Sequence, residues 1–439
     1  MENARFVALK ALIKMENDES YSNITIDSAL KKYKLSSNDS AFASALFYGV
    51  LERRITIDYI LKRYLKKPLN KMDIDVLNIL RLGIYQLKFM EKVPDNAAVN
   101  ESVKLISMVR KTSAKGLCNA VLRNFIRDNK EYTLPSDDLE QLSIEYSVPI
   151  DFAKSLCADY GFDCAKGILH GFLASKYLSI RVNTTKISTD EYLSKLIENG
   201  VDAKSSPIVE DCLIINNSGD VRQLYGYNDG LFHVQDSASQ LAVKALHVLK
   251  DSTVLDVCSA PGGKTFTAAE YTSEKVISCD LYEHKVKLIE DGAKRLSLNN
   301  VKAIVNDASV FNEKLGIFDR VLCDLPCSGM GILGKKPEIR YKNVTFVDKL
   351  SEIQYNLLVC SKNYLKMGGI LVYSTCTLNH KENRNVASKF LKENEDFEPF
   401  EIFPDIERAI DEPNNMLTLM PHIHGTDGFF ISAFKKKGC

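Results

Sequence analysis

Two cysteines follow strand-like segments in the last third of the chain, and both could act as nucleophiles. Cys327 lies in Asp324-Leu325-Pro326-Cys327-Ser328-Gly329, and Cys376 lies in Tyr373-Ser374-Thr375-Cys376-Thr377. Each motif comes directly after an apolar run, so the two thiols would leave neighbouring strand ends of one sheet. A lone cysteine in such a place is more often a small buried hydrophobe. Two thiols, with Asp324 three residues before one of them, favour covalent catalysis.

A loop of small residues upstream predicts a nucleoside pocket. An apolar run leads into Asp256-Val257-Cys258-Ser259-Ala260-Pro261-Gly262-Gly263-Lys264-Thr265, where the glycines allow close approach of backbone to ligand. The loop is not a phosphate-binding P-loop, because Cys258 stands where that motif needs glycine, and no G-x-G-x-x-G is present. Asp280 and Asp307 end the next two strands, placed to meet a ribose and an adenine. We therefore expect S-adenosylmethionine rather than NAD or ATP, although any one of these acids alone could be a helix N-cap.

The segments that must position these residues alternate between strand and helix. Longer helical stretches separate short apolar runs at 254–257, 276–279, 303–305, 320–323 and 370–373. This order predicts a Rossmann-like α/β domain over 236–437 with a mostly parallel, doubly wound sheet. Ahead of it, 140–235 mixes strands with a helix that begins at Ser188, which pairs with Glu191 in a capping box. That pattern is typical of a small α+β module.

Residues 1–132 are predicted to form an all-helical bundle of about seven helices, since apolar residues recur there at helical spacing. One face contains Leu77, Leu80, Ile84 and Leu87, and a second contains Leu117, Val121, Leu122, Phe125 and Ile126. Residues 1–130 hold 23 Lys and Arg against 14 Asp and Glu, although the whole chain has 57 of each. A basic helical part favours a polyanionic partner, while a merely solvated face is the simpler alternative.

The composition excludes several other classes of protein. The 439 residues, of which 45% are hydrophobic, fit two or three folded domains. No apolar run approaches the roughly 20 residues of a membrane span, and the N-terminus lacks a secretory signal. We therefore expect a cytoplasmic protein without a membrane partner. The 11 cysteines include no C-x-x-C pair, so we expect reduced thiols and no metal. Nothing in the sequence demands a dimer, and we expect a monomer.

The motifs taken together resemble a known family. The loop at 261–264 and the two cysteine motifs are similar to those of the NOL/NOP/Sun group of RNA 5-methylcytosine methyltransferases. Further similar motifs are Arg181-Val182-Asn183, Val234-Gln235-Asp236 and Gly425-Thr426-Asp427-Gly428-Phe429-Phe430. The N-terminal helices resemble the NusB domain, a pairing typical of the bacterial Sun/RsmB type. The chain departs from the pattern at Ser259, Leu325 and Thr377, and none of these changes removes a reactive group.

The resemblance implies an enzyme that transfers a methyl group from S-adenosylmethionine to carbon 5 of a cytosine in 16S ribosomal RNA. It implies that Cys376 adds to carbon 6 and that Cys327 helps remove the proton at carbon 5. Asp324 would hold the base edge, donating to ring nitrogen 3 if it is protonated. The cofactor would lie against Cys258, Ser259, Ala260, Pro261, Gly262, Gly263, Lys264, Asp280, Asp307 and Asp324.

Several alternatives stay open from the sequence. The same chemistry could act on transfer RNA or on another ribosomal cytosine. The chain could also be a NusB-like RNA-binding protein with an idle sheet domain, but such a domain should have lost a cysteine or a pocket acid. Lys335, Lys336 and Arg340 could hold phosphates beside the site or form a solvated loop. Lys264 could line the pocket or lie at the surface.

Overall fold

The chain forms two compact units in the computed structural model, which describes residues 3–17, 22–174, 177–216, 219–341 and 347–438. Unit 1 comprises Met1–Ser155 and Lys335–Lys342, and unit 2 comprises Leu156–Gly334 and Asn343–Cys439. Within the described ranges, no helix has both the length and the apolar character that spanning a bilayer requires.

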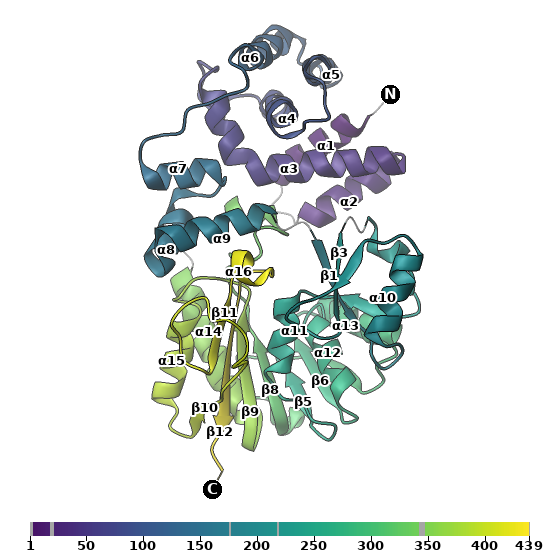
Figure 1. Ribbon diagram of the computed structural model, residues 1–439, viewed down its shortest axis with the longest axis vertical. Coiled ribbons are helices and arrows are strands. Elements are labelled where there is room, and N and C mark those ends of the chain that lie inside the picture. The colour runs from purple at the N-terminus through teal and green to yellow at the C-terminus, as the bar shows by residue number, and fades with distance from the viewer. Residues whose placement is uncertain (1–2, 18–21, 175–176, 217–218, 342–346, 439) are drawn as a thin grey trace. The chain divides into compact units, whose positions relative to one another are not determined.

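Unit 1 is helical (Figure 1). Its helices are α1 (Ala4–Asn17), α2 (Ser22–Tyr33), α3 (Ser37–Lys62), α4 (Ile74–Phe89), α5 (Asp95–Met108), α6 (Lys115–Arg127) and α7 (Asp138–Glu145). Short 3-10 turns, η1 (Leu69–Lys71) and η2 (Thr112–Ala114), lie between them. The predicted bundle is confirmed, with six α-helices rather than about seven among the described residues up to 130. Helix α8 (Ile150–Tyr160) starts in unit 1 and ends in unit 2.

Local signals and packing explain these helices. The Asp73 side chain accepts hydrogen bonds from the first turn of α4 and so fixes where that helix begins. The predicted apolar face of α4 is buried, with Leu80 and Ile84 fully inaccessible. On α6 the prediction holds for Val121, Leu122 and Phe125, but Leu117 is exposed.

A short segment that follows the Cys327 motif along the chain belongs to unit 1. It contains the turn η5 (Pro337–Tyr341). The Ser22 hydroxyl donates to the Glu338 carboxylate over 2.8 Å, and the Arg54 guanidinium lies 3.5 Å from the Tyr341 ring centroid. Arg340 is 2% exposed. The expectation that Arg340 holds a phosphate is therefore wrong, because its guanidinium packs inside the helical unit and does not reach solvent. Lys335 and Lys336 are exposed.

The first half of unit 2 contains a four-stranded antiparallel sheet. Helix α9 (Phe162–Ala174) precedes β1 (Tyr177–Val182), α10 (Thr189–Glu198), β2 (Ala203–Ser205), β3 (Cys212–Asn216), η3 (Val221–Gln223) and β4 (Phe232–Val234). The strand order is β2-β3-β1-β4. The Ser188 side chain caps α10 by accepting from the Glu191 backbone N–H, as predicted. A small core that includes Ile180, Tyr192 and Leu213 lies between α10 and the sheet, which is the α+β module expected from the sequence.

The second half of unit 2 is built on an eight-stranded sheet. Its strands are β5 (Val254–Asp256), β6 (Val276–Asp280), β7 (Val301–Val305), β8 (Phe318–Asp324), β9 (Leu365–Thr375), β10 (Phe397–Pro399), β11 (Met416–Leu419) and β12 (Phe429–Lys436). The order is β10-β12-β9-β8-β5-β6-β7, and β11 pairs with β12. Strands β5 to β9 pair in parallel, whereas β12 runs antiparallel to β9. The Rossmann-like, mostly parallel sheet is thus confirmed.

Helices cover both faces of this sheet (Figure 1). One layer holds α11 (Ser237–Lys244), α12 (Gly263–Tyr271) and α13 (Glu283–Leu296), and the other holds α14 (Val347–Ser361) and α15 (Arg384–Glu393). Successive strand residues alternate between the two cores. Leu322 packs with the first layer and Val321 with the second. The remaining short elements are η4 (Glu313–Leu315), η7 (Lys362–Tyr364) and α16 (Pro421–His424).

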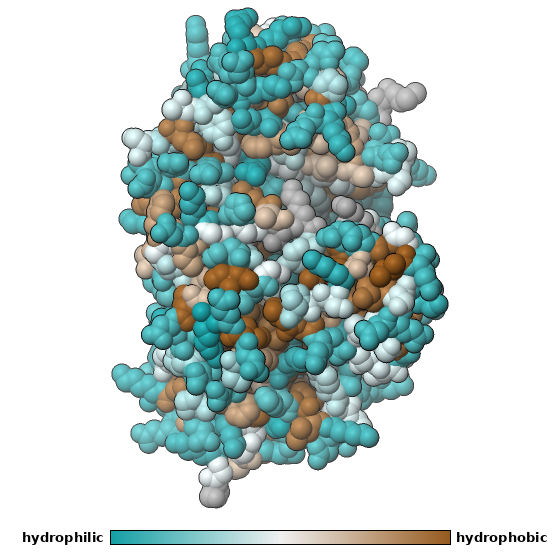
Figure 2. Space-filling view, viewed as in Figure 1, coloured by the Kyte–Doolittle hydropathy of each residue, from teal (hydrophilic) through white to brown (hydrophobic). Residues whose placement is uncertain are grey.

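The strand order reverses between β5 and β8. At such a switch point the two connections leave in opposite directions, and ligands bind beyond the carboxyl ends of the strands. Figure 2 shows hydrophobic residues gathered beside α16 and α11, at the end of unit 2 where the parallel strands finish. The motifs that carry the candidate chemistry follow these strand ends.

Candidate active site

Cys327 and Cys376 face each other beyond the ends of β8 and β9. Their Sγ atoms lie 3.1 Å apart, and both side chains are half-buried. The two strands pair in parallel with Asp324 opposite Ser374, so the residues that follow leave at the same edge of the sheet. The pKa of Cys327 is raised well above its ordinary value by its hydrogen bond with Cys376, by burial, and by the charges of Cys376 and Glu382. The close contact therefore favours a single negative charge on the pair of sulfurs.

Asp324 lies at the end of β8 and accepts two hydrogen bonds from side chains. The Lys264 ammonium donates to its Oδ2 over 2.7 Å, and the Ser374 hydroxyl donates to its Oδ1 over 2.8 Å. Burial acts to lower the pKa of Lys264, but Asp324 and then Cys376 raise it above its ordinary value. Lys264 is therefore a held cation inside the site, which decides against the surface alternative.

The glycine loop joins β5 to α12. Gly262, with φ at 107°, has a left-handed backbone that favours glycine, and it caps α12. Asp256 ends β5 and is 1% exposed, with its Oδ2 accepting from the Thr265 hydroxyl over 2.7 Å. Burial raises the pKa of Asp256 to about 7. Ser259, which departs from the family pattern, donates to the Cys279 carbonyl over 2.8 Å and so ties the loop to β6.

Asp280 and Asp307 lie at the ends of the next two strands, as predicted. Asp280 ends β6, is 7% exposed, and has its Oδ1 3.7 Å from the Lys285 ammonium. Asp307 follows β7 and is exposed, and hydrogen bonds from the Ser309 hydroxyl and backbone N–H lower its pKa. Both carboxylates thus stand as hydrogen-bond acceptors along one edge of the sheet.

These residues fit S-adenosylmethionine better than a nucleotide. The Oδ1 atom of Asp256 is buried and finds no hydrogen-bond partner among the described residues. Lys264 is the only basic residue of the loop, and it is paired with Asp324 and not with a phosphate site. Acidic acceptors without a phosphate cradle suit a nucleoside with a cationic sulfonium. Among the described residues, no group of three or more His, Cys, Asp and Glu side chains could hold a metal ion.

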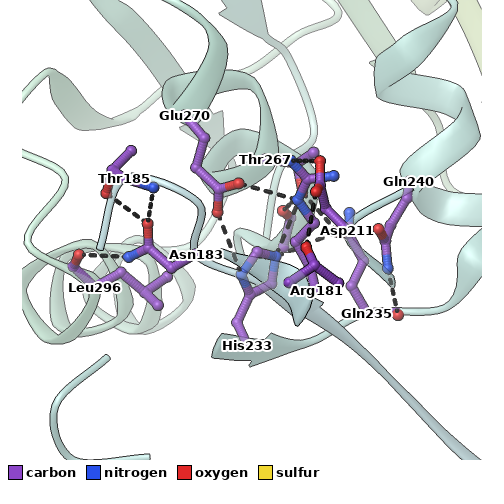
Figure 3. Close-up of polar contacts among 12 residues, drawn as sticks. Arg181, Asn183, Thr185, Asp211, His233, Gln235, Gln240, Thr267, Glu270 and Leu296 are labelled. Atoms are coloured by element: carbon purple, nitrogen blue, oxygen red, sulfur yellow. Dashed lines mark hydrogen bonds and ion pairs between the residues drawn. The ribbon is translucent and has the colours of Figure 1, made fainter. Parts of the chain in front are cut away.

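A buried polar network connects the small sheet to α12 (Figure 3). Arg181 of β1 is fully inaccessible and donates to the Glu270 carboxylate of α12 over 3.0 Å. The Thr267 hydroxyl lies 2.6 Å from Gln235 Oε1 and 3.1 Å from the Gly263 carbonyl. Two motifs whose role the sequence left unstated, Arg181-Val182-Asn183 and Val234-Gln235-Asp236, therefore support the helix that starts at the glycine loop.

Two buried groups of this network have strongly shifted pKa values. Burial, and then the charge of Arg181, lower the pKa of His233 to about 3, so its imidazole is neutral at pH 7. Burial raises the pKa of Glu270 to about 7, although the Arg181 guanidinium acts to lower it. The network is a buried structural support, since His233 and Glu270 are buried and neither belongs to the glycine loop or to the ends of β5 to β9.

Backbone contacts also join the distant motifs. The Gly331 N–H donates to the Cys376 carbonyl over 2.9 Å, and the Gly428 N–H donates to the Gly331 carbonyl over 2.8 Å. A Cβ atom on Gly331 would lie 1.8 Å from the Gly428 oxygen and 2.9 Å from the Cys376 oxygen. The segment after Cys327, the segment after Cys376 and the start of β12 thus cross at glycines because side chains would not fit.

The structure adds residues that sequence reasoning missed. Ser374 orients Asp324, and Glu382 and Gln354 bond to the segments that carry both thiols. Ser374 could have been found, because it lies two residues before Cys376 in the motif Tyr373-Ser374-Thr375-Cys376-Thr377. Glu382 gives no local signal, since its partners Ser328 and Gln354 lie on other segments of the chain.

Family profiles match at residues 243–435 (16S rRNA methyltransferase RsmB/F), 2–127 (NusB family) and 149–222 (RsmF/B-like, ferredoxin-like domain). The chain is 36% identical over 448 residues to the probable ribosomal RNA small subunit methyltransferase B of Bacillus subtilis (strain 168), covering 99% of each chain.

Solved structures share this architecture. The crystal structure of PH0851 matches with a TM-score of 0.82 and 25% identity, covering 98% of each chain. A methyltransferase homolog protein from Pyrococcus horikoshii matches with a TM-score of 0.60 and 26% identity, covering 69% of this chain and 100% of that one. With full-length identity above one third to a curated relative, the chain belongs to the RsmB/F family of 16S rRNA methyltransferases, whose methyl donor is S-adenosylmethionine.

Proposed function

We propose that this enzyme methylates carbon 5 of a cytosine in 16S ribosomal RNA through a covalent bond between Cys376 and the base. The observation that carries the proposal is the pair of sulfurs 3.1 Å apart, beside the ion pair of Asp324 and Lys264. Carbon 5 of cytosine is a poor nucleophile. A thiolate that adds to carbon 6 makes carbon 5 electron-rich, and a site with two thiols can both add to the base and release it.

Two cysteines are sufficient for every bond that forms and breaks at the cytosine ring. The Cys376 sulfur forms a bond to carbon 6, and the electron pair of the 5,6 double bond moves onto carbon 5 and, by conjugation, ring nitrogen 3, which makes carbon 5 nucleophilic. S-Adenosylmethionine, when bound, supplies a methyl group activated by its sulfonium. Once Cys376 is bonded to the base, its hydrogen bond to Cys327 and its charge are gone, and these are two of the causes that raise the pKa of Cys327. Cys327 then loses its proton to solvent and takes the carbon 5 proton, the double bond re-forms, and the Cys376–carbon 6 bond breaks.

Asp324 is proposed to act as an acceptor. Lys264 and Ser374 donate to its two oxygens, which is the pattern of an ionised carboxylate. It is therefore suited to accept from the exocyclic amino group of cytosine and not to donate to ring nitrogen 3. The Lys264 ammonium supplies positive charge beside the base as negative charge develops there.

The cofactor-side roles are also proposals. Cys258 to Lys264 would line the methionine and sulfonium end, Asp280 would accept from the ribose hydroxyls, and Asp307 would meet the adenine edge. Gly262 and the buried Asp256 oxygen support this assignment. The expected domain boundaries, 1–132, 140–235 and 236–437, and the monomeric state stay predictions.

The helical unit is proposed to bind RNA phosphates. Lys62, Lys66 and Lys67 line one hollow of about 660 Å³ in unit 1, together with Asp58 and Asn70. Binding through phosphates should weaken steeply with salt. The target base must leave any stack to reach the thiols, at a cost of a few kcal/mol, so an unpaired cytosine is favoured. A ribosomal substrate would place the reaction in the cytoplasm.

Bisulfite sequencing of ribosomal and transfer RNA from a deletion strain tests the substrate. We expect one 16S cytosine to lose its protection from bisulfite conversion in the deletion strain. A plasmid with the intact gene should restore this protection, and a plasmid with Cys376→Ala should not. An unchanged 16S pattern with an altered transfer RNA would overturn the assignment. Calorimetry with S-adenosylmethionine tests the idle alternative, since an idle domain would bind none.

A further inference from the structure

Glu382 is a fully inaccessible carboxylate beyond β9 that bonds to the segments of both thiols. Its Oε2 accepts from the Ser328 backbone N–H over 2.8 Å and from the Gln354 amide over 3.1 Å. Its Oε1 accepts from the Ser328 hydroxyl over 2.6 Å and from the Thr377 hydroxyl over 3.4 Å. Ser328 follows Cys327 and Thr377 follows Cys376, so one carboxylate holds the residue after each thiol.

The residues before the two thiols are held by the same group of side chains. Gln354 of α14 donates to the Pro326 carbonyl over 2.9 Å, on the other side of Cys327. The Thr375 hydroxyl donates to the Asn383 side chain over 2.6 Å, on the other side of Cys376, and Asn383 donates back to the Thr377 carbonyl over 2.9 Å. Each cysteine thus lies between two neighbours that are held by hydrogen bonds. The adjacent residues Glu382 and Asn383 take part in holding the neighbours of both cysteines.

The charges around the two sulfurs differ. The Glu382 carboxylate accepts from the backbone N–H of Ser328, the residue after Cys327, and its charge is among the causes that raise the pKa of Cys327. The Lys264 ammonium is paired with Asp324, and the charges of Asp324 and then Cys376 raise the pKa of Lys264. The Tyr373 hydroxyl of β9 donates to the Glu382 backbone carbonyl, and burial first, then the charges of Cys327 and Glu382, raise the pKa of Tyr373 well above its ordinary value. Glu382 thus disfavours negative charge on Cys327, while the cation that interacts with Cys376 is the Lys264 ammonium, which donates to Asp324 over 2.7 Å.

We propose that Glu382 is a positioning residue that holds the loops of Cys327 and Cys376 in one geometry and keeps their shared negative charge on Cys376. The carboxylate touches neither sulfur and acts through Ser328, Thr377 and its charge. Its effect on turnover rests on the proposed two-thiol reaction, whereas its effect on the thiols can be measured without RNA.

Two substitutions separate the hydrogen bonds from the charge. In Glu382→Gln the amide oxygen can accept from the Ser328 N–H and from Gln354, and the amide nitrogen can donate to the two hydroxyls, which can turn to accept. This variant keeps the contacts and removes the charge, whereas Glu382→Ala removes both. Glu412 offers a matched control, because it is a buried carboxylate of the same unit that accepts from the Thr418 N–H and hydroxyl over 2.7 and 2.8 Å.

Alkylation tests the charge. In the Cys376→Ser chain, the rate at which iodoacetamide modifies Cys327 is followed against pH by peptide mass spectrometry. We expect Glu382→Gln to lower the midpoint of the curve of alkylation rate against pH by about one pH unit, since the substitution removes one negative charge near the buried Cys327 thiol. Glu412→Gln should leave the midpoint in place. An unmoved midpoint in Glu382→Gln would overturn the charge role, whether or not the chain methylates RNA.

Steady-state methylation of a 16S rRNA fragment tests the positioning. We expect Glu382→Ala to lower kcat by about tenfold or more with KM changed by less than about twofold, because misplaced reacting groups cost rate and not binding. Glu382→Gln should recover most of that loss, with its pH–rate profile displaced toward lower pH. A wild-type kcat in Glu382→Ala would overturn the inference. If Glu382→Ala does not fold, Thr377→Val removes one of the four hydrogen bonds and should still lower kcat, and an unchanged kcat there would overturn the inference equally.

Discussion

The Sγ atoms of Cys327 and Cys376 lie 3.1 Å apart although the two cysteines are 49 positions apart in the sequence. The parallel pairing of β8 with β9 brings them together, since Asp324 lies opposite Ser374 in the register. At this distance the two sulfurs share a hydrogen bond, and one of them retains a proton. The two sulfurs therefore differ in their protonation at any one time. This difference suits a reaction in which one thiol adds to the base and the other helps to release it.

Replacing Cys327 should separate these roles. We expect Cys327→Ala to add Cys376 to the RNA base but to release it slowly, so that a protein–RNA adduct accumulates and survives denaturing gel electrophoresis. The double variant Cys327→Ala/Cys376→Ala should form no adduct. Cys360→Ala, at a half-buried cysteine of α14, controls for loss of a thiol. Normal turnover by Cys327→Ala would show that the second thiol is dispensable.

Asp280 should account for a large part of cofactor affinity. Asp280→Asn halves the acceptor capacity and removes the charge that a ribose would meet at the end of β6. We expect the Kd for S-adenosylmethionine to rise by about tenfold or more, as loss of a hydrogen bond to a charged group costs about 1.5–3 kcal/mol. Isothermal titration calorimetry measures it. Asp291→Asn, an exposed position of α13, should bind as the unchanged chain does, and equal Kd values for the two variants would refute the assignment.

Gly331 should tolerate no side chain. In Gly331→Ala the new Cβ would overlap the Gly428 oxygen, so the segments that carry Cys376 and Gly428 must move apart. We expect a lower midpoint of thermal unfolding and a loss of methyl transfer of more than about tenfold, since small misplacements of reacting groups are costly. Gly116→Ala in α6, where a Cβ meets nothing within 4 Å, should stabilise slightly. Full activity in Gly331→Ala would contradict the close crossing.

The buried Asp256 should make stability depend on pH. Its folded pKa of about 7 lies above the ordinary value of about 3.9, so the folded chain holds a proton that the unfolded chain has lost. Its contribution is fully present below about pH 4 and is lost as pH rises through 7. Between pH 5 and 8 we expect stability to fall by on the order of 2 kcal/mol from this group.

Urea unfolding at the two pH values measures this dependence. Asp256→Asn should make stability fall less between the two pH values. In this variant the raised pKa of Glu270 still lowers stability as the pH rises, and the lowered pKa of His233 acts in the opposite direction. Asp251→Asn, at an exposed carboxylate, serves as the control and should leave the pH dependence unchanged. An identical dependence in Asp256→Asn and the unchanged chain would mean that Asp256 is ionised in the folded state.

The local sequence determined which residues lie at the strand ends that form the site. The alternation of short apolar runs with longer helical stretches indicates a parallel sheet, because buried strands and amphipathic helices have different periods. Cys327, Cys376, Asp280 and the glycine loop could be placed at strand ends from this pattern alone. A strand end is a short-range property, which depends on the residues immediately before it.

Tertiary structure decided which side chains meet. Lys264 could equally have been a surface residue until the switch point between β5 and β8 brought it to Asp324, 60 positions away. Arg340 follows the catalytic motif in sequence but packs in the helical unit. Glu382 has no motif of its own, and its function depends on Ser328 and Gln354, which come from other segments. Contacts of this kind depend on strand register and on the course of loops, which no local pattern encodes.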